Sequence, residues 1–259
     1  MRNRIIKYMA CGSLVLTTLL FSCAKKADTP LQTNSDFSNQ TTMQLFMAMV
    51  NATRNYILVD GNPVNGASIT TGNVFPAVGP GFSINAGFRS FLVRDTLTAT
   101  TQVPLSFAQN LQAGKYYTIF MYDTINSPKQ KTVETPIGIS TSEAQVRFAN
   151  FVYSPTAVPA IDIYSLKQNT NVFTNIPVTG VSDYIKVNTN ITDTFYVRAA
   201  GSGVNLQNYK TTAPTGPVDI LTAFTPRPGR SYTLVFQGGY RATATSNSTV
   251  RTLSVFTDN

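Results

Sequence analysis

The chain has 259 residues, a formal charge of +8 and no histidine. Without histidine it lacks the commonest general base and the commonest metal ligand in proteins, which excludes a Ser-His-Asp triad and a histidine zinc site. Most of its basic residues are scattered singly along the sequence, whereas a nucleic-acid surface usually shows a clustered basic stripe. We therefore expect no nucleic-acid partner.

The first 22 residues have the layout of an export signal. Three cations precede the apolar run GSLVLTTLLF, which is shorter than the roughly 20 apolar residues of a membrane span. Residues 20–23, Leu-Phe-Ser-Cys, resemble a bacterial lipobox, although Phe21 replaces the usual small or branched residue. We expect residues 1–22 to be a lipoprotein signal peptide and Cys23 to be lipidated. The alternative is a plain secretory signal followed by an incidental cysteine.

Lipidation at Cys23 would anchor the chain in the outer membrane of a cell envelope, on a face that the sequence does not determine. The mature chain would then have no free thiol, because the other cysteine, Cys11, is removed with the signal. Cysteine nucleophiles, thiolate metal sites and disulfides would all be absent. Residues 23–40 are polar and lack periodicity, which predicts a flexible tether.

From Met43 onward the sequence consists of short runs rich in Val, Ile, Phe, Tyr and Thr, separated by Gly, Pro and Asn. No window places apolar residues at helical spacing over several turns, so we predict an all-β fold. Three blocks recur in the same order: QLFMAMVNA (44–52) as QVRFANFVY (145–153), FLVR (91–94) as FYVR (195–198), and GKYYTIF (114–120) as GRSYTLVF (229–236).

Recurrence in the same order indicates two copies of one domain. We predict two tandem immunoglobulin-like antiparallel β-sandwich domains, at 41–136 and 143–259, joined by a linker at 134–143. A sandwich is favoured over an open sheet because the second face of an open sheet would stay wet.

Each copy places a glycine three residues before a tyrosine that opens a strand. The glycine supplies a positive φ at a turn, and Tyr117 and Tyr232 are predicted to form tyrosine corners, in which the hydroxyl bonds to nearby backbone. The alternative is that both rings are exposed platforms for stacking on a glycan.

The segment VRFANFVYSPTAVPAIDIYS, at 146–165, is similar to the opening of the domain of unknown function 4397, found in lipoproteins of Bacteroidetes. The later YIKV, FYVR and GRSYTL segments also resemble that family. The resemblance implies an envelope-anchored β-sandwich with no assigned activity. It covers most of 143–237, whereas domain one is a degenerate copy that lacks the Ser-Pro-x-x-x-Pro loop.

That loop is a candidate binding surface, because its prolines stiffen it and a stiff loop loses little entropy on binding. Its candidate residues are Ser154, Pro155, Thr156 and Pro159. The alternative is a rigid connection between strands of opposite sheets.

Two short segments resemble the acceptor motif for O-glycosylation in Bacteroidetes, an aspartate followed by Ser or Thr and an aliphatic residue. They are Asp95-Thr96-Leu97 and Asp123-Thr124-Ile125, with Thr96 and Thr124 as candidate acceptors. The alternative is that each aspartate and threonine simply closes a turn.

The remaining residue types do not suggest catalysis. A glycosidase needs two carboxylates at a fixed separation, and the only glutamates, Glu134 and Glu143, flank the linker. We expect no enzyme activity, cofactor or metal. The prediction is a binding or adhesion module for an unknown glycan or protein. The alternatives are a structural fimbria-like assembly subunit and an accessory glycan-capture lipoprotein of a polysaccharide uptake system.

Overall fold

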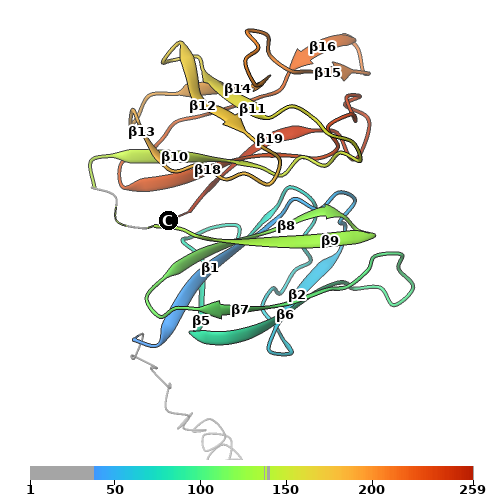
Figure 1. Cartoon of the computed structure of the whole chain (residues 1–259), viewed down its shortest axis with the longest axis vertical. Helices are drawn as coiled ribbons and strands as arrows, with labels where there is room; N and C mark the ends of the chain where they lie inside the picture. The colour runs from blue at the N-terminus through green and yellow to red at the C-terminus, as the bar shows by residue number, and fades with distance from the viewer. Residues whose placement is uncertain (1–37, 137, 139–140, 259) are drawn as a thin grey trace, which may run out of the picture. The chain divides into compact units, whose positions relative to one another are not determined.

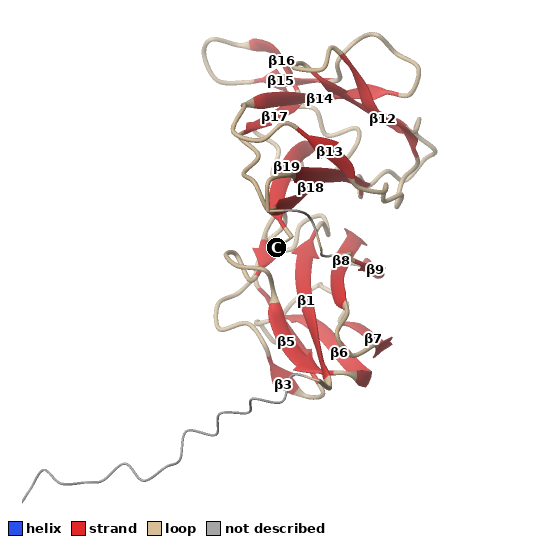
Figure 2. Cartoon of the chain, turned by 90° about the vertical axis from the view of Figure 1, so that its left-hand side faces the viewer, coloured by secondary structure: helices blue, strands red, loops and turns tan. Residues whose placement is uncertain are grey.

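The computed structural model describes residues 38–136, 138 and 141–258. The described residues form strands and loops without α-helix, which confirms the predicted all-β fold (Figure 2). Within them, no helix has the length and apolar character needed to cross a bilayer. The predicted signal peptide, the lipidation site Cys23 and most of the tether lie outside the described residues.

The strands between residues 40 and 134 form two sheets. They are β1 (Gln40–Met47), β2 (Asn55–Val59), β3 (Asn62–Pro63), β4 (Val74–Phe75), β5 (Phe82–Asn85), β6 (Gly87–Asp95), β7 (Leu105–Leu111), β8 (Tyr116–Thr124) and β9 (Ser127–Glu134). One sheet has the order β4-β1-β8-β9, with β5 also pairing with β1, and the other has the order β3-β2-β6-β7. Buried side chains of both sheets, including Leu45, Ile57, Phe91 and Ile119, form one apolar core.

The strands between residues 144 and 257 form three further sheets. They are β10 (Ala144–Asn150), β11 (Ile161–Ser165), β12 (Thr170–Ile176), β13 (Ile185–Val187), β14 (Asp193–Ala199), β15 (Gln207–Lys210), β16 (Gly216–Asp219), β17 (Leu221–Phe224), β18 (Arg230–Gln237) and β19 (Thr252–Thr257). The orders are β13-β10-β18-β19, β12-β11-β14-β17 and the pair β15-β16. A second core contains Phe148, Ile163, Phe195 and Leu234.

Two strand pairs depart from the predicted antiparallel arrangement. β1 runs parallel to β8, and β10 runs parallel to β18. Each pair is parallel because the chain between its strands crosses to the opposite sheet before it returns, and parallel neighbours need such a long connection. The sequence pattern did not show this, since strand direction leaves side-chain alternation unchanged.

The parallel pairs also correct the alignment of the recurring blocks. Gln44 lies opposite Thr118, whereas Arg147 lies opposite Thr233. Gln44 is therefore equivalent to Arg147, two residues beyond the position that the sequence blocks indicate. A shift of two residues keeps every side chain on the same face of a strand, so the hydrophobic pattern fits both alignments.

A third apolar cluster joins the two sets of strands. The Phe46 and Phe256 rings stack with centroids 5.3 Å apart, and the Phe120 and Phe151 rings stack at 4.5 Å. Strands β1 and β8 consequently lie against β10 and β18 (Figure 1) and are buried on both faces. The chain from Ser38 onward forms one compact unit.

Candidate binding groove

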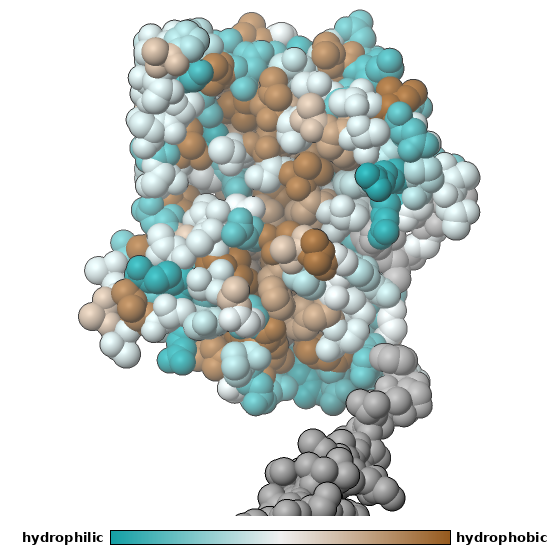
Figure 3. Space-filling view, turned by 180° about the vertical axis from the view of Figure 1, so that it is seen from behind, coloured by the Kyte–Doolittle hydropathy of each residue, from teal (hydrophilic) through white to brown (hydrophobic). Residues whose placement is uncertain are grey.

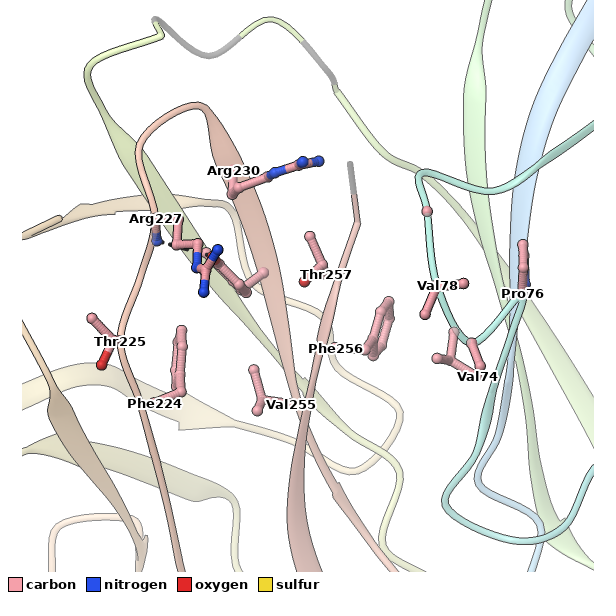
Figure 4. Close-up of a pocket in the computed structure, with 13 residues that line it drawn as sticks. Val74, Pro76, Val78, Phe224, Thr225, Arg227, Arg230, Val255, Phe256 and Thr257 are labelled. Atoms are coloured by element: carbon pink, nitrogen blue, oxygen red, sulfur yellow. Dashed lines mark hydrogen bonds between the residues drawn. The ribbon is translucent and has the colours of Figure 1, made fainter. Parts of the chain in front are cut away.

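A groove of about 560 Å³ lies where the end of β19 meets the loop after β4 (Figure 4). Most of its lining is apolar: Val74, Pro76, Ala77, Val78, Phe224, Tyr232, Val255 and Phe256. Apolar surface also gathers in the middle of the face shown in Figure 3. Ligand sites in proteins commonly combine such an apolar lining with a few polar groups.

One wall is the loop from Pro76 to Gly81. Gly81 has a φ of 123°, and a Cβ there would lie 2.6 Å from the Met43 carbonyl oxygen, so only glycine allows this close approach to β1. The Gln44 side chain donates a hydrogen bond to the Gly79 carbonyl at 3.3 Å. The loop is thereby held against β1, yet it leaves Val78 85% exposed.

The opposite wall begins at Phe224, the last residue of β17. Its ring packs on Phe195 and Tyr232, with centroids 5.6 and 4.9 Å away. The chain then turns through Gly229, whose φ is 72°. The Arg227 backbone N–H donates to the Tyr232 hydroxyl at 3.0 Å. This bond, which is the arrangement of a tyrosine corner, fixes the backbone of the groove rim.

The same geometry occurs in the first set of strands. The Gln112 N–H donates to the Tyr117 hydroxyl at 3.2 Å, and Gly114 has a φ of 73°. Tyr117 and Tyr232 are both buried, so neither ring presents a free face of the kind that stacks on a sugar. Their role in the structure is to hold the turn before a core strand.

The rim of the groove is positively charged. Arg227 and Arg230 are exposed, and no carboxylate of the described residues forms an ion pair with either guanidinium. A second hollow of about 680 Å³ adjoins them, lined also by Asn190, Thr225 and Pro228. Guanidinium groups bind carboxylates and phosphates in a bidentate manner. The groove is therefore suited to a ligand that is both apolar and anionic.

A buried ion pair lies between the two sets of strands. Arg147 is 2% exposed, and its Nη2 donates to Asp258 at 3.2 Å and to the Thr118 and Thr135 hydroxyls at 2.9 and 3.0 Å. Thr118 lies in β8 and Thr135 directly follows β9, so this guanidinium links the two sets. Its Nε donates to the Thr233 hydroxyl at 2.8 Å.

The acidic end of this network is also saturated with hydrogen bonds. Burial raises the pKa of the Asp258 carboxyl, while Arg147 and the hydroxyls of Thr233 and Tyr184 act to lower it. Burial also raises the pKa of Tyr184, whose hydroxyl stays protonated and donates to Asp258 at 2.8 Å. Arg147 lies 4.8 Å from the centre of the Tyr184 ring. The network is satisfied internally, which indicates a structural role.

The predicted binding loop lies away from the groove. Pro155, Thr156 and Pro159 are exposed and Ser154 is half-buried, but none of them lines the groove. The Thr156 hydroxyl accepts a hydrogen bond from Arg241 at 3.1 Å, and its N–H donates to Ser154 at 3.4 Å. The loop therefore remains a separate prediction.

The two candidate glycosylation sites differ in exposure. Thr96 is exposed directly after β6, and its N–H donates to the Arg54 carbonyl at 2.9 Å. Thr124 is half-buried and is the last residue of β8, where it pairs with Ser127. The motif Asp123-Thr124-Ile125 therefore overlaps the end of β8.

Asp162 lies between Ile161 and Ile163 in β11 and is not a solvent-exposed residue. It is buried, and its carboxylate accepts hydrogen bonds from the Asn175 and Gly201 N–H groups at 2.7 and 3.0 Å and from the Asn171 side chain at 3.1 Å. Asn171 and Asn175 belong to β12, whose pairing with β11 is irregular, and Gly201 follows β14.

The two glutamates that flank the predicted linker are engaged with lysines. Glu134 and Glu143 form surface ion pairs with Lys115 and Lys186, each at 2.6 Å. No group of three or more acidic or other metal-ligating side chains among the described residues could hold a metal ion.

Sequence reasoning missed the arginines of the rim. Arg227 and Arg230 flank the Pro228-Gly229 turn, and two cations beside a tight turn were the available signal. It also missed Arg147 as a buried group, because one arginine inside an apolar strand resembles an edge residue. No protein-family model matches the chain, and no curated protein matches it significantly.

Proposed function

We propose that this protein is a non-catalytic cell-envelope lipoprotein that acts as a binding or adhesion module, with the groove as its contact surface. The observation that supports it is a pair of exposed arginines, which form no ion pair with the described carboxylates, above an apolar groove that contains the highly exposed Val78. Exposed apolar surface beside a polar rim often marks an interaction site.

Rigid walls favour this proposal. The Gly79 carbonyl is tied to Gln44, and the Arg227 backbone is tied to Tyr232. A surface that is already ordered loses little conformational entropy when it binds. The groove can therefore hold an amphiphilic anion without a large rearrangement.

The proposal also includes the domain organisation and the family of the chain. We infer two tandem immunoglobulin-like sandwiches that follow a lipoprotein signal peptide, in a member of the domain of unknown function 4397 family. The motif resemblance in residues 146–165 supports the family, and the repeated tyrosine corners support the tandem arrangement.

A binding screen tests the groove. Full-length protein purified from its host would be screened against acidic and neutral oligosaccharides and peptides. Arg227→Ala combined with Arg230→Ala should weaken capture of anionic probes about tenfold or more, because charge-assisted hydrogen bonds are lost. Arg94→Ala, at an exposed arginine of β6 outside the groove, is the matched control. Capture of no probe, or equal capture by all variants, would reject the groove as the contact surface.

The lipid anchor is tested separately. We expect Cys23→Ser to move the protein from the detergent phase to the aqueous phase or to block processing of the signal. Detergent partitioning that is unchanged in this variant would show that Cys23 carries no anchor.

A further inference from the structure

The groove contains a free strand edge. β19 pairs with β18 and with no other strand of the described residues. The Asp258 N–H donates to the Ser231 carbonyl at 2.8 Å. Because hydrogen bonding alternates along an antiparallel pair, the backbone groups of Val255 and Thr257 then point away from β18. Both residues line the groove.

These outward backbone groups are mostly unused. The Thr257 carbonyl accepts a hydrogen bond from the Gln44 side chain at 2.9 Å. Among the described residues, no backbone group bonds to the outward N–H and C=O of Val255 or to the N–H of Thr257. An unpaired edge of this kind is a template for a further strand.

The walls of the groove are placed to contact both faces of an added strand. Successive side chains of a strand point to opposite faces. Phe224 lies on one side of β19, and Val74 and Val78 lie on the other side (Figure 4). Apolar side chains at alternate positions would therefore all meet apolar walls.

The charge of the rim selects among possible occupants. Arg227 and Arg230 favour a segment with carboxylates and disfavour a basic one. A glycan fits less well, because Phe224 is packed between Phe195 and Tyr232 and sugar-stacking needs a free ring face. The outward N–H and C=O groups of β19 can instead form hydrogen bonds with the backbone of another polypeptide.

We propose that the ligand of the groove is an extended acidic polypeptide segment that adds as a strand to the free edge of β19, which contacts it through Val255 and Thr257. This proposal rests on the proposed function, since it names the class of partner for the same groove. The partner is recognised by its backbone, by apolar side chains at alternate positions and by carboxylates beside Arg227 and Arg230.

The test uses three labelled probes with the full-length protein. The first is a six-residue peptide, matched to the length of β19, with alternating valine and threonine and a glutamate at each end. The second is the same peptide with N-methyl groups at alternate residues, which removes its backbone donors on one edge. The third is an acidic oligosaccharide of galacturonate.

We expect the first peptide to bind and its N-methylated form to bind at least about tenfold more weakly, because the hydrogen bonds to β19 are lost. Arg227→Ala with Arg230→Ala should weaken binding similarly, and Arg94→Ala should not. Bound peptide should also slow amide hydrogen exchange at Val255 and Thr257 and leave exchange at Leu234, in the centre of the same sheet, unchanged.

The other outcomes overturn the proposal in distinguishable ways. Equal binding of both peptides, or unchanged exchange at Val255, would reject strand addition. Binding of the oligosaccharide alone, lost with the two arginines, would reject a polypeptide partner and leave the proposed groove intact. Binding of none of the three probes would reject both the strand addition and the groove.

Discussion

Gln44 in β1 and Arg147 in β10 are equivalent positions that face the same boundary between the two sets of strands. Gln44 donates to the carbonyls of Gly79 and Thr257, at 3.3 and 2.9 Å. Arg147 instead bonds to Asp258 and to hydroxyls from both sets of strands. A neutral amide is satisfied by backbone carbonyls, whereas a charge at the equivalent place needs a buried counter-charge.

The comparison shows how one residue that differs between the two copies can fix the way in which the two sets of strands pack. The apolar contacts that join the sets are non-directional, whereas the Arg147 guanidinium fits only where Thr118, Thr135 and Asp258 converge. Breaking a buried ion pair by removing one partner is far more costly than replacing both.

The largest expected effect is therefore at Arg147. Arg147→Ala leaves Asp258 buried without its counter-charge and should lower the free energy of unfolding by about 3 to 5 kcal/mol. Urea denaturation would measure it. Gln44→Ala should cost only about 1 kcal/mol, and Arg147→Met combined with Asp258→Leu should recover most of the loss. Equal losses at Gln44 and Arg147 would contradict the comparison.

The next effect concerns the apolar cluster between the sets. Phe151→Ala removes the ring that stacks on Phe120 and should lower the free energy of unfolding by about 3 kcal/mol, because a cavity is left. Thermal unfolding monitored by circular dichroism would show one destabilised transition. Phe88→Ala, at an exposed ring of β6, should change stability by no more than about 0.5 kcal/mol and is the control. Similar behaviour of both variants would mean that the cluster does not form.

A smaller loss of stability is expected at the two tyrosine corners, which should differ in their effect on ligand binding. Tyr117→Phe and Tyr232→Phe should each cost about 1 kcal/mol in unfolding free energy, since each removes one hydrogen bond. Only Tyr232→Phe should also weaken the binding of anionic probes in the groove, because the Tyr232 hydroxyl holds the backbone of Arg227. Equal probe binding by both variants would show that this corner does not organise the rim.

The smallest effect depends on pH. The Leu97 backbone N–H holds the pKa of Asp95 below its ordinary value, with further lowering from Arg54 and Thr100 and opposition from burial. A lowered pKa in the folded state stabilises the fold above the ordinary value near 3.8 and loses that contribution as pH falls through the folded value. Asp95→Asn should cost less than about 1 kcal/mol at pH 7, and the difference should shrink as the pH falls below the ordinary value near 3.8 and through the lower pKa of the folded state. A constant difference across this range would contradict the assignment.

The sequence allowed the strands to be predicted because alternation and turn residues are local signals. The glycine and tyrosine of each corner were recognised for the same reason, since Gly114 with Tyr117 and Gly229 with Tyr232 lie within one turn. The parallel pairs and the irregular pairing around Asp162 were not predictable, because both depend on strands that are distant in sequence.

The groove was hidden for a similar reason. Val78 and Arg227 are far apart in the sequence, and only packing of the two sets of strands brings their loops to one hollow. Asp258 likewise reads as a polar residue after the last strand, although it is buried against Arg147. Sequence patterns report which face of a strand is apolar, but not which distant element covers it.

The position of β1 has a mechanical consequence. β1 lies inside its sheet, with β8 on one side and β4 and β5 on the other, and it runs parallel to β8 over six paired positions from Thr42 to Met47. A pull at Gln40 along the axis of the strand loads these hydrogen bonds in shear. They must then fail together rather than one after another. Traction between the proposed anchor and a ligand at the proposed β19 site would therefore be borne by a strand held on both sides.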